Sequence, residues 1–419
     1  MSGLARRIGL FDATMAVMGG IVGSGIFVAP AIVARSAHSN AAILGVWLVG
    51  GAAAMLGAFI YSELSAARPA AGGQYVYLRE AYHPAVAFLY GWALLLVIET
   101  GGMAANAITF ARHFLALPIG ENAVAAIAVG SLTVINCLGV SAGARVQSAL
   151  MVVKILAIAT LVTFGLFATA APAAVPFSGG NSLGAALVPV LFSYGGWQTA
   201  CFVAGEMKEP RRDLPRALVI GVAAVIVLYV AIAFVCLRVL GPERLAHTAA
   251  PALEVMTLAV GPRGASLIAA AIALSTLGFL SQSILTAPRV YFAMAEDGLF
   301  FRSVARVNRR TRAPVVAIAL QGALTIAIAL AGTFELILNY VTSIDFIFFA
   351  LTAGAVFIFR KRGSTERKIP GHPVTTLAFI AVCAAVVIST FRQHPLQGVI
   401  GLCITLLGLP VFFLWRRRS

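Results

Sequence analysis

Charged residues are scarce in this sequence. Asp, Glu, Lys and Arg make up only 11% of its 419 residues, whereas 60% are hydrophobic. Soluble globular domains carry roughly 25% charged residues, and a chain of this length cannot hide so much apolar surface in a water-soluble core. The composition excludes a soluble enzyme, a secreted disulfide scaffold and a disordered tail. It predicts an all-α polytopic membrane protein, because the apolar runs are long and continuous, unlike the alternating strands of a barrel.

Cysteine and histidine are also few. The five cysteines lie inside apolar runs, as small buried hydrophobic residues do, and none falls in an expected extracellular loop. The sequence has no His-Glu-x-x-His motif, and its Gly23-Ser24-Gly25 segment has no histidine base nearby. We therefore predict no metal site, no cofactor, no enzymatic activity and no disulfide-linked partner; the cysteines are Cys137, Cys201, Cys236, Cys383 and Cys403.

Positive charge exceeds negative charge, with 30 Lys and Arg residues against 15 Asp and Glu residues. A nucleic-acid-binding protein would carry this excess on a soluble basic surface, for which the composition leaves no room. With the N-terminus placed in the cytoplasm, most basic residues fall at the cytoplasmic ends of the spans, as the positive-inside bias requires. We predict a multi-pass protein of the cell membrane with both termini cytoplasmic, surrounded by membrane lipid, monomeric and without a nucleic-acid partner.

Apolar runs divide the chain into twelve expected spans, each near the ~20 residues that cross a bilayer as a helix. Glu63 and Glu206 lie close to the cytoplasmic ends of two of them, where capping or ion pairing is expected. The expected spans are 11–34, 41–66, 85–115, 122–139, 147–170, 183–205, 214–240, 264–296, 314–331, 334–359, 373–391 and 396–415.

Two of these spans carry glycine-rich clusters near their middle. The first runs from Gly19 to Gly25 and is followed by Pro30, and the second is Phe192-Ser193-Tyr194-Gly195-Gly196-Trp197. Each glycine weakens a helix by about 1 kcal/mol relative to alanine. One such cluster alone is equally compatible with close packing of two helices through small residues. Two clusters in the first and sixth spans predict broken helices lining a cavity instead.

The separation of the two clusters also indicates an internal repeat. When the second and third spans are shifted along the sequence by the distance between the two clusters, they fall on the seventh and eighth spans. The fourth span, shifted in the same way, misses the ninth because of a basic insert at 299–313. Five spans per unit is an odd number, so the second unit is inverted, as in many secondary transporters. We predict a first repeat at 1–170, a second inverted repeat at 171–360 and two further helices at 361–419.

Broken helices suggest a type of ligand. A half-helix that begins after a break exposes N–H groups and a partial positive charge, which suit a carboxylate. A half-helix that ends at a break exposes carbonyl groups, which suit an ammonium or another cation. A ligand with both charges on adjacent atoms, an α-amino acid, matches two such breaks placed side by side.

The sequence resembles the amino acid–polyamine–organocation (APC) superfamily of transporters and, within it, the L-amino-acid transporter subfamily. The resemblance covers residues 8–360 and implies a leucine-transporter-type fold, with five plus five inverted spans and two extra C-terminal helices. It is carried by Gly23-Ser24-Gly25-Ile26-Phe27 with Pro30, Gly72-Gly73-Gln74-Tyr75-Val76-Tyr77-Leu78, Tyr194-Gly195-Gly196-Trp197, the segment 206–217, and Arg289 with Asp297-Gly298.

The resemblance also implies a substrate-binding set. Amides of Gly23, Ser24 and Gly25 would hold the substrate carboxylate, and carbonyls of Ile21, Phe192 and Gly195 would hold its ammonium. Phe192 would be an aromatic gate, and Ser193 belongs to the same segment. The residues expected to face the side chain are Gly102, Asn106, Gln198 and Asp345. Several relatives are neutral at the Asp345 position, so the preferred side chain stays open.

Charges within the spans are candidates for coupling. A lysine at mid-membrane costs roughly 2.5–3.5 kcal/mol, and Lys154 is flanked by apolar residues. It either snorkels to the interface or, as in sodium-independent relatives, occupies the place of the sodium ion and bridges spans one and eight. Ser275 is its expected partner. Glu99 is either a coupling acid or a neutral, hydrogen-bonded structural group.

These features favour a secondary active transporter of α-amino acids that works by alternating access, as a sodium-independent exchanger or facilitator. The alternative is a proton-coupled amino-acid symporter that uses Lys154 or Glu99. Amines without a carboxylate are less suitable substrates, because the amides at 23–25 would then have no anion to bind. A channel or a purely structural membrane protein would not need two broken, repeat-related helices.

Overall fold

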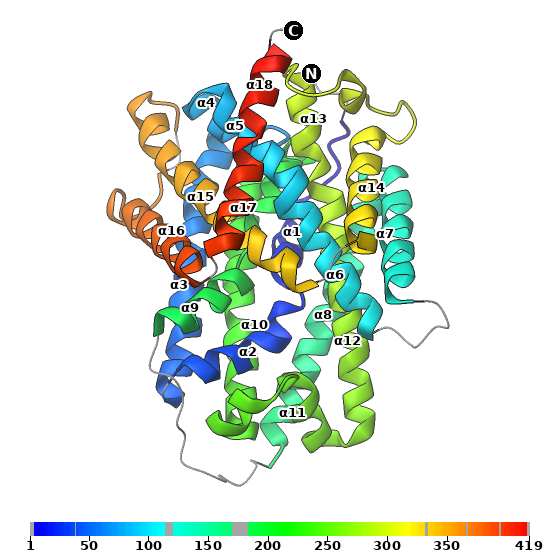
Figure 1. Cartoon of the computed structure of the whole chain (residues 1–419), viewed down its shortest axis with the longest axis vertical. Helices are drawn as coiled ribbons and strands as arrows, with labels where there is room; N and C mark the ends of the chain where they lie inside the picture. Colours follow the sequence, from blue (N-terminus) through cyan, green and yellow to red (C-terminus); the bar gives the residue numbers. More distant parts are fainter. Residues whose placement is uncertain are drawn as a thin grey trace.

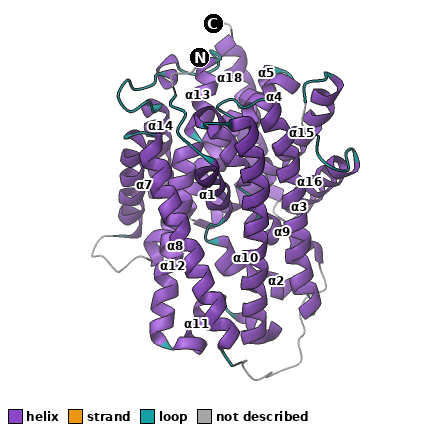
Figure 2. Ribbon diagram, turned by 180° about the vertical axis from the view of Figure 1, so that it is seen from behind, coloured by secondary structure: helices purple, strands orange, loops and turns teal. Residues whose placement is uncertain are grey.

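The computed structural model describes residues 4–37, 39–113, 120–169, 183–331, 334–365, 368–393 and 395–416. These residues form helices joined by short loops, and most long helices run along the long axis of the molecule (Figure 1). Figure 2 shows the same bundle from behind, drawn as helices and loops. A single isolated β-bridge joins Ile8 to Met207 in the described part. The prediction of an all-α chain is confirmed.

The described residues of the first half of the chain form eight α-helices and one π-helical turn. They are α1 (Leu10–Ile21), α2 (Gly25–Ser36), α3 (Asn40–Ala67), α4 (Gln74–Ala81), α5 (Pro84–Ala93), the π-helical η1 (Leu94–Ile98), α6 (Glu99–His113), α7 (Glu121–Cys137) and α8 (Val140–Phe167).

In the second half, the part that the structure describes contains ten α-helices and two 3₁₀-helices. They are α9 (Leu183–Ser193), the 3₁₀-helix η2 (Trp197–Glu206), α10 (Pro210–His247), α11 (Pro251–Val260), α12 (Pro262–Thr286), α13 (Pro288–Glu296), the 3₁₀-helix η3 (Arg302–Ala305), α14 (Val315–Ala331), α15 (Phe334–Lys361), α16 (Val374–Gln393), α17 (Pro395–Leu406) and α18 (Gly408–Arg416).

A helix or helix pair lies at each expected span. In the described part, eight helical segments are long and apolar enough to cross a membrane, or nine when the bent pair α1–α2 is counted as one span. Helices α7 and α14 are apolar but reach only 17 residues each. The short helices α4 and α11 were not predicted, because a helix of ten residues or fewer gives no span-length apolar run.

Helix α1 lies at the centre of the bundle, which explains why its break matters. It contacts α8, α10, α12 and η2, and nearly all of its residues are buried. Helix α10 passes very close to it at Gly221, where a Cβ atom would lie 2.7 Å from Cγ1 of Val17. Small residues at such crossings let helix backbones approach each other inside a membrane protein. The break after Ile21 is therefore enclosed by protein on several sides.

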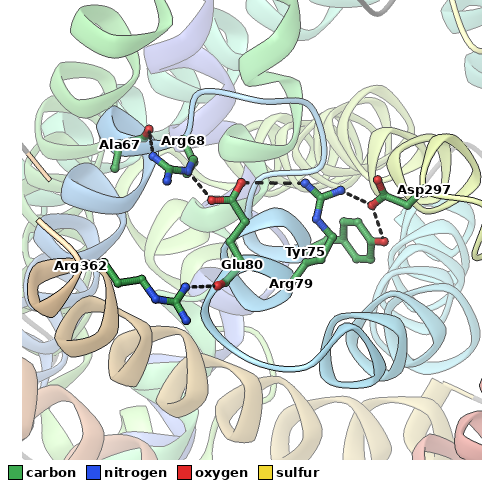
Figure 3. A network of polar contacts seen from close by, with 7 residues as sticks. All are labelled: Ala67, Arg68, Tyr75, Arg79, Glu80, Asp297 and Arg362. Atoms are coloured by element: carbon green, nitrogen blue, oxygen red, sulfur yellow. Dashed lines mark hydrogen bonds and ion pairs between the residues drawn. The ribbon is translucent and has the colours of Figure 1, made fainter. Parts of the chain in front are cut away.

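Both termini lie at one end of the molecule, together with α4 and α13, and α11 lies at the opposite end (Figure 1). The terminal end is tied together by a polar network that joins α4 to its neighbours (Figure 3). Asp297 accepts from Tyr75 at 2.8 Å and pairs with Arg79. Burial and the Asp297 carboxylate raise the pKa of the Tyr75 phenol, so the hydroxyl stays a donor. The terminal-end network comprises Arg68, Tyr75, Arg79, Glu80, Asp297 and Arg362.

Two fully buried glutamates are ion-paired close to the same end. Glu206 forms a bidentate pair with Arg289, at 3.0 Å between Oε2 and Nη2, and both side chains are 0% exposed. Glu63 pairs with Arg360 at 2.6 Å. The expected ion pairing of both acids is confirmed. The backbone carbonyl of Glu206 also accepts from the amide of Ile8, which fixes the N-terminal segment against η2.

Candidate functional site

The first span is broken where the glycines predict it. Helix α1 ends at Ile21, α2 begins at Gly25, and the two are bent by 43°. Val22 has an extended backbone and Ser24 provides no side-chain cap. Glycine loses more conformational entropy in a helix than any other residue, so the cluster ends α1 here. The predicted break in this span is confirmed.

Side chains from other helices satisfy the carbonyl groups of this break. Tyr229 of α10 donates its hydroxyl to the Ile21 carbonyl at 3.0 Å. The ammonium of Lys154 on α8 donates to the next carbonyl, that of Val22. On α12, the Ser275 hydroxyl donates to the carbonyl of Gly23 at 3.2 Å. Unwound backbone persists at membrane depth only when other groups replace its helical partners.

Three amide groups that follow Val22 at the break are unpaired in the described part of the chain. Within the described ranges, the N–H groups of Gly23, Ser24 and Gly25 donate no hydrogen bond. Gly25 is the first residue of α2, so these amides stand at the positive end of that helix. The Ser24 hydroxyl reaches Oδ1 of Asn106 on α6 at 3.4 Å. The break thus presents free N–H donors beside carbonyl oxygens that already accept hydrogen bonds from side chains.

The sixth span is also interrupted, but in another way. Helix α9 ends at Ser193, and a turn leads into η2, a 3₁₀-helix of 10 residues. Such helices rarely exceed 3–4 residues. The turn depends on Gly196, whose φ of +100° lies in the left-handed region that favours glycine. The second predicted break is therefore confirmed, although the glycines did not predict its 3₁₀ continuation.

The two breaks touch through their backbones. A Cβ atom on Gly20 would lie 2.4 Å from the Gly196 carbonyl oxygen, and a Cβ atom on Gly196 would lie 2.0 Å from that of Gly20. Only hydrogen atoms fit between the chains there. Thr199 donates to the Gly196 carbonyl at 2.8 Å, and Gln198 accepts from the Gly196 amide at 3.0 Å. This crossing brings the two interrupted helices side by side.

A cavity of about 340 Å³ lies between the breaks, near the lower end of the ~300–1,000 Å³ range of small-molecule sites. It continues along Val28 and Ile32 of α2 and Pro189 of α9. Helix α2 lies on the side of α1 that faces away from the chain termini (Figure 1). The cavity is therefore directed toward the α11 end, opposite the terminal-end network.

Every residue of the expected substrate-binding set lines this cavity: Ile21, Gly23, Ser24, Gly25, Gly102, Asn106, Phe192, Ser193, Gly195, Gln198 and Asp345. Phe192 is 37% exposed. Phe279 and Phe346 also line the cavity and were not predicted. Both are aromatic residues within apolar runs, and nothing in the sequence distinguishes them from residues that face lipid or pack in the core.

Lys154 does not snorkel to the interface. Its side chain is only 2% exposed, and it lies against Gly278 of α12, where a Cβ atom would be 2.5 Å from the lysine Cε. It therefore bridges the α1 break and the eighth span. In the described part, no hydrogen bond joins it to Ser275, its expected partner. The two side chains donate to adjacent carbonyls, those of Val22 and Gly23.

Two acids also line the cavity, the buried Glu99 and the half-buried Asp345. Glu99 begins α6 directly after the π-helical turn and is 6% exposed, and Asp345 lies in α15. The Oδ1 atom of Asp345 is buried and has no hydrogen-bond partner among the described residues. Neither acid forms an ion pair there, unlike Glu63 and Glu206.

The sequence is similar to those of known amino-acid transporters. The sequence profile of the family described as amino acid permease matches residues 8–409. The serine/threonine exchanger SteT of Bacillus subtilis is 32% identical, and the alignment covers 100% of this chain and 98% of the relative. The large neutral amino acids transporter small subunit 2 of Mus musculus is 29% identical, with 99% and 82% covered. The Asc-type amino acid transporter 1 of Homo sapiens is 27% identical, with 99% and 84% covered.

Proposed function

Since the chain belongs to the amino acid permease family, in the APC superfamily, we propose that it moves α-amino acids across the cell membrane by alternating access, as a sodium-independent exchanger. Exchange is the mode named for the serine/threonine exchanger, which this chain resembles along its whole length. The family matched here consists of permeases, so an enzymatic role is not proposed.

The observation that supports this proposal is the contact between two interrupted helices beside one cavity. The free amides of Gly23, Ser24 and Gly25 suit the substrate carboxylate at the positive end of α2. The carbonyls of Ile21 and Phe192 suit its ammonium. Each of these carbonyls already accepts one hydrogen bond, from Tyr229 and from the Gly195 amide. A carbonyl oxygen has two lone pairs, so each retains one for the substrate.

Buried Lys154 supports transport without sodium. Its ammonium donates to the Val22 carbonyl at the first break, and the Ser275 hydroxyl donates to the neighbouring carbonyl, that of Gly23. A fixed positive charge at this position repels a sodium ion and occupies an oxygen that could coordinate one. The proton-coupled alternative would use Lys154 or Glu99, and no comparison favours it.

For the whole molecule we propose twelve spans in the leucine-transporter arrangement, with repeats at 1–170 and 171–360 and two further helices at 361–419. The boundary between the repeats lies outside the described residues. The positive-inside bias favours cytoplasmic termini, which would make the cavity face outward. We further propose that the chain works as a monomer without a disulfide-linked partner, and native mass spectrometry of the purified protein tests this.

Proteoliposomes test the proposed function. Vesicles loaded with an unlabelled amino acid should take up the same labelled amino acid, without sodium and without a pH gradient. Empty vesicles should take up far less, because an exchanger needs a substrate on both sides. Uptake that requires sodium or a proton gradient would contradict the exchange mode, and absence of uptake for all twenty amino acids would contradict the transport function.

A further inference from the structure

One wall of the cavity is acidic, whereas most of its surface is apolar. Glu99 comes from α6 and Asp345 from α15, and these two helices pack against each other. The apolar residues Ile98, Phe279 and Phe346 line the same cavity. Polar groups placed in a mostly apolar pocket are the ones that orient and select a ligand.

The protein leaves this acidic wall without a strong donor of its own. Oδ1 of Asp345 is buried and unpartnered among the described residues. In the part of the chain that the structure describes, Glu99 has only the neutral hydroxyl of Ser283 on α12 as a hydrogen-bonding neighbour. Lys154 donates to the Val22 carbonyl instead. Buried acceptors are nearly always hydrogen-bonded, so an unpartnered carboxylate oxygen on a residue that lines the cavity points to a ligand that supplies the donor.

The proposed function fixes which part of the substrate reaches this wall. If the amides at 23–25 hold the carboxylate and the carbonyls of Ile21 and Phe192 hold the ammonium, the main-chain atoms lie at the breaks. The side chain is then left to meet the other residues of the cavity, which include Glu99 and Asp345.

We infer that Glu99 and Asp345 form an acceptor subsite that selects α-amino acids whose side chains donate hydrogen bonds. The favoured side chains carry a hydroxyl, an amine or a guanidinium group, and all-carbon side chains of the same size are disfavoured. This inference rests on the proposed function, because it assumes that the substrate main chain occupies the breaks. A site built to hydrogen-bond its substrate rejects analogues without the donor more strongly than an apolar pocket rejects a change in size.

Matched pairs of amino acids test the inference in proteoliposomes. Threonine and valine have nearly the same shape but differ in one hydroxyl, and lysine and norleucine differ in one ammonium. Each is used to compete with the exchange of a labelled substrate. We expect threonine and lysine to inhibit at concentrations about tenfold or more below those of valine and norleucine, a clear difference in binding free energy.

Variants at Asp345 assign the preference to the acidic wall. Asp345→Leu replaces the acceptor by an apolar side chain of similar size. It should reduce both preferences, for threonine over valine and for lysine over norleucine, to within about threefold. Asp345→Asn keeps an acceptor but no charge, so it should weaken the lysine preference more than the threonine preference. Glu121→Gln is the matched control, since Glu121 is an exposed partner of Arg112 far from the cavity lining.

The outcomes separate this inference from the proposed function. If the wild-type protein exchanges valine and norleucine as well as threonine and lysine, the acceptor subsite is overturned while amino-acid exchange stands. If it exchanges none of the twenty amino acids, the proposed function fails first. If Asp345→Leu is inactive, thermal stabilisation of the purified variant by threonine and by valine replaces transport as the measurement. A retained threonine preference would overturn the inference.

Discussion

At the scale of single residues, Gly20 and Gly196 decide whether the two breaks can meet. Each would place a Cβ atom within 2.4 Å of the other's carbonyl oxygen, a distance that no real Cβ contact tolerates. The neighbouring carbonyls are held by Tyr229, Lys154 and Ser275, which come from three different helices. The glycines and the hydrogen-bond donors from distant parts of the sequence therefore fix the geometry of the breaks together.

Gly20→Ala tests this contact. The added methyl group must push the first and sixth spans apart, and overpacking of this kind typically costs about 1–3 kcal/mol. We expect substrate affinity to fall about tenfold or more while the amount of protein in the membrane is unchanged. Gly130→Ala is the control, because a Cβ atom there meets nothing within 4 Å. Equal substrate affinity in the two variants would show that the close contact is dispensable.

Lys154→Ala tests the buried ammonium. Its removal leaves the Val22 carbonyl without its donor, at a cost of about 1–3 kcal/mol, and it leaves a space next to Gly278. We expect sodium-free exchange to be nearly abolished, or its pH profile to change. The exposed Lys208→Ala serves as control. Exchange rates equal to wild type at every pH would remove the assigned role of Lys154.

At the scale of elements, α13 and η2 are held together by a buried ion pair. Glu206 and Arg289 are both 0% exposed, and Nη1 of Arg289 has no partner among the described residues. Isolated buried charges are very unfavourable, so this pair matters most when one member is lost. Because the Glu206 carbonyl also binds the N-terminal segment, the pair supports the terminal end of the bundle.

Arg289→Met should destabilise the protein by about 3–5 kcal/mol, because it leaves Glu206 buried and unpaired. Adding Glu206→Leu should restore much of this loss. Thermal unfolding of detergent-purified variants gives the comparison. Arg212→Met, which breaks an exposed pair with Glu209, should change stability by no more than about 1 kcal/mol. If the double variant is less stable than Arg289→Met, this electrostatic explanation is wrong.

The helices differ in how well the sequence predicts them. Spans and breaks could be predicted because apolar length and glycine content act locally. The π-helical turn before Glu99 and the 3₁₀ form of η2 could not, because apolar length and glycine content do not distinguish these forms from an α-helix. The substrate-binding set came largely from family resemblance. The contact between Tyr229 and Ile21 joins residues 208 positions apart, and no local pattern reports it.

At the scale of the whole molecule, one end carries the terminal-end network and the central cavity extends along helices that lead toward the other end. The terminal-end network joins α4 to α13 and to the chain after α15 (Figure 3). The cavity instead extends along α2 and α9, toward the α11 end. Alternating access requires this asymmetry to be reversible. The exposed, partly solvated ion pairs of the network are weak enough to break during a transport cycle.

The most direct test of zwitterion binding at the breaks is sodium-free counterflow in proteoliposomes with three matched compounds. They are a transported α-amino acid, the amine formed by its decarboxylation, and the 2-hydroxy acid that lacks its ammonium. If the breaks bind both charges, only the amino acid should drive exchange, and the other two should compete weakly or not at all. Exchange driven equally well by the amine or the hydroxy acid would contradict this binding mode.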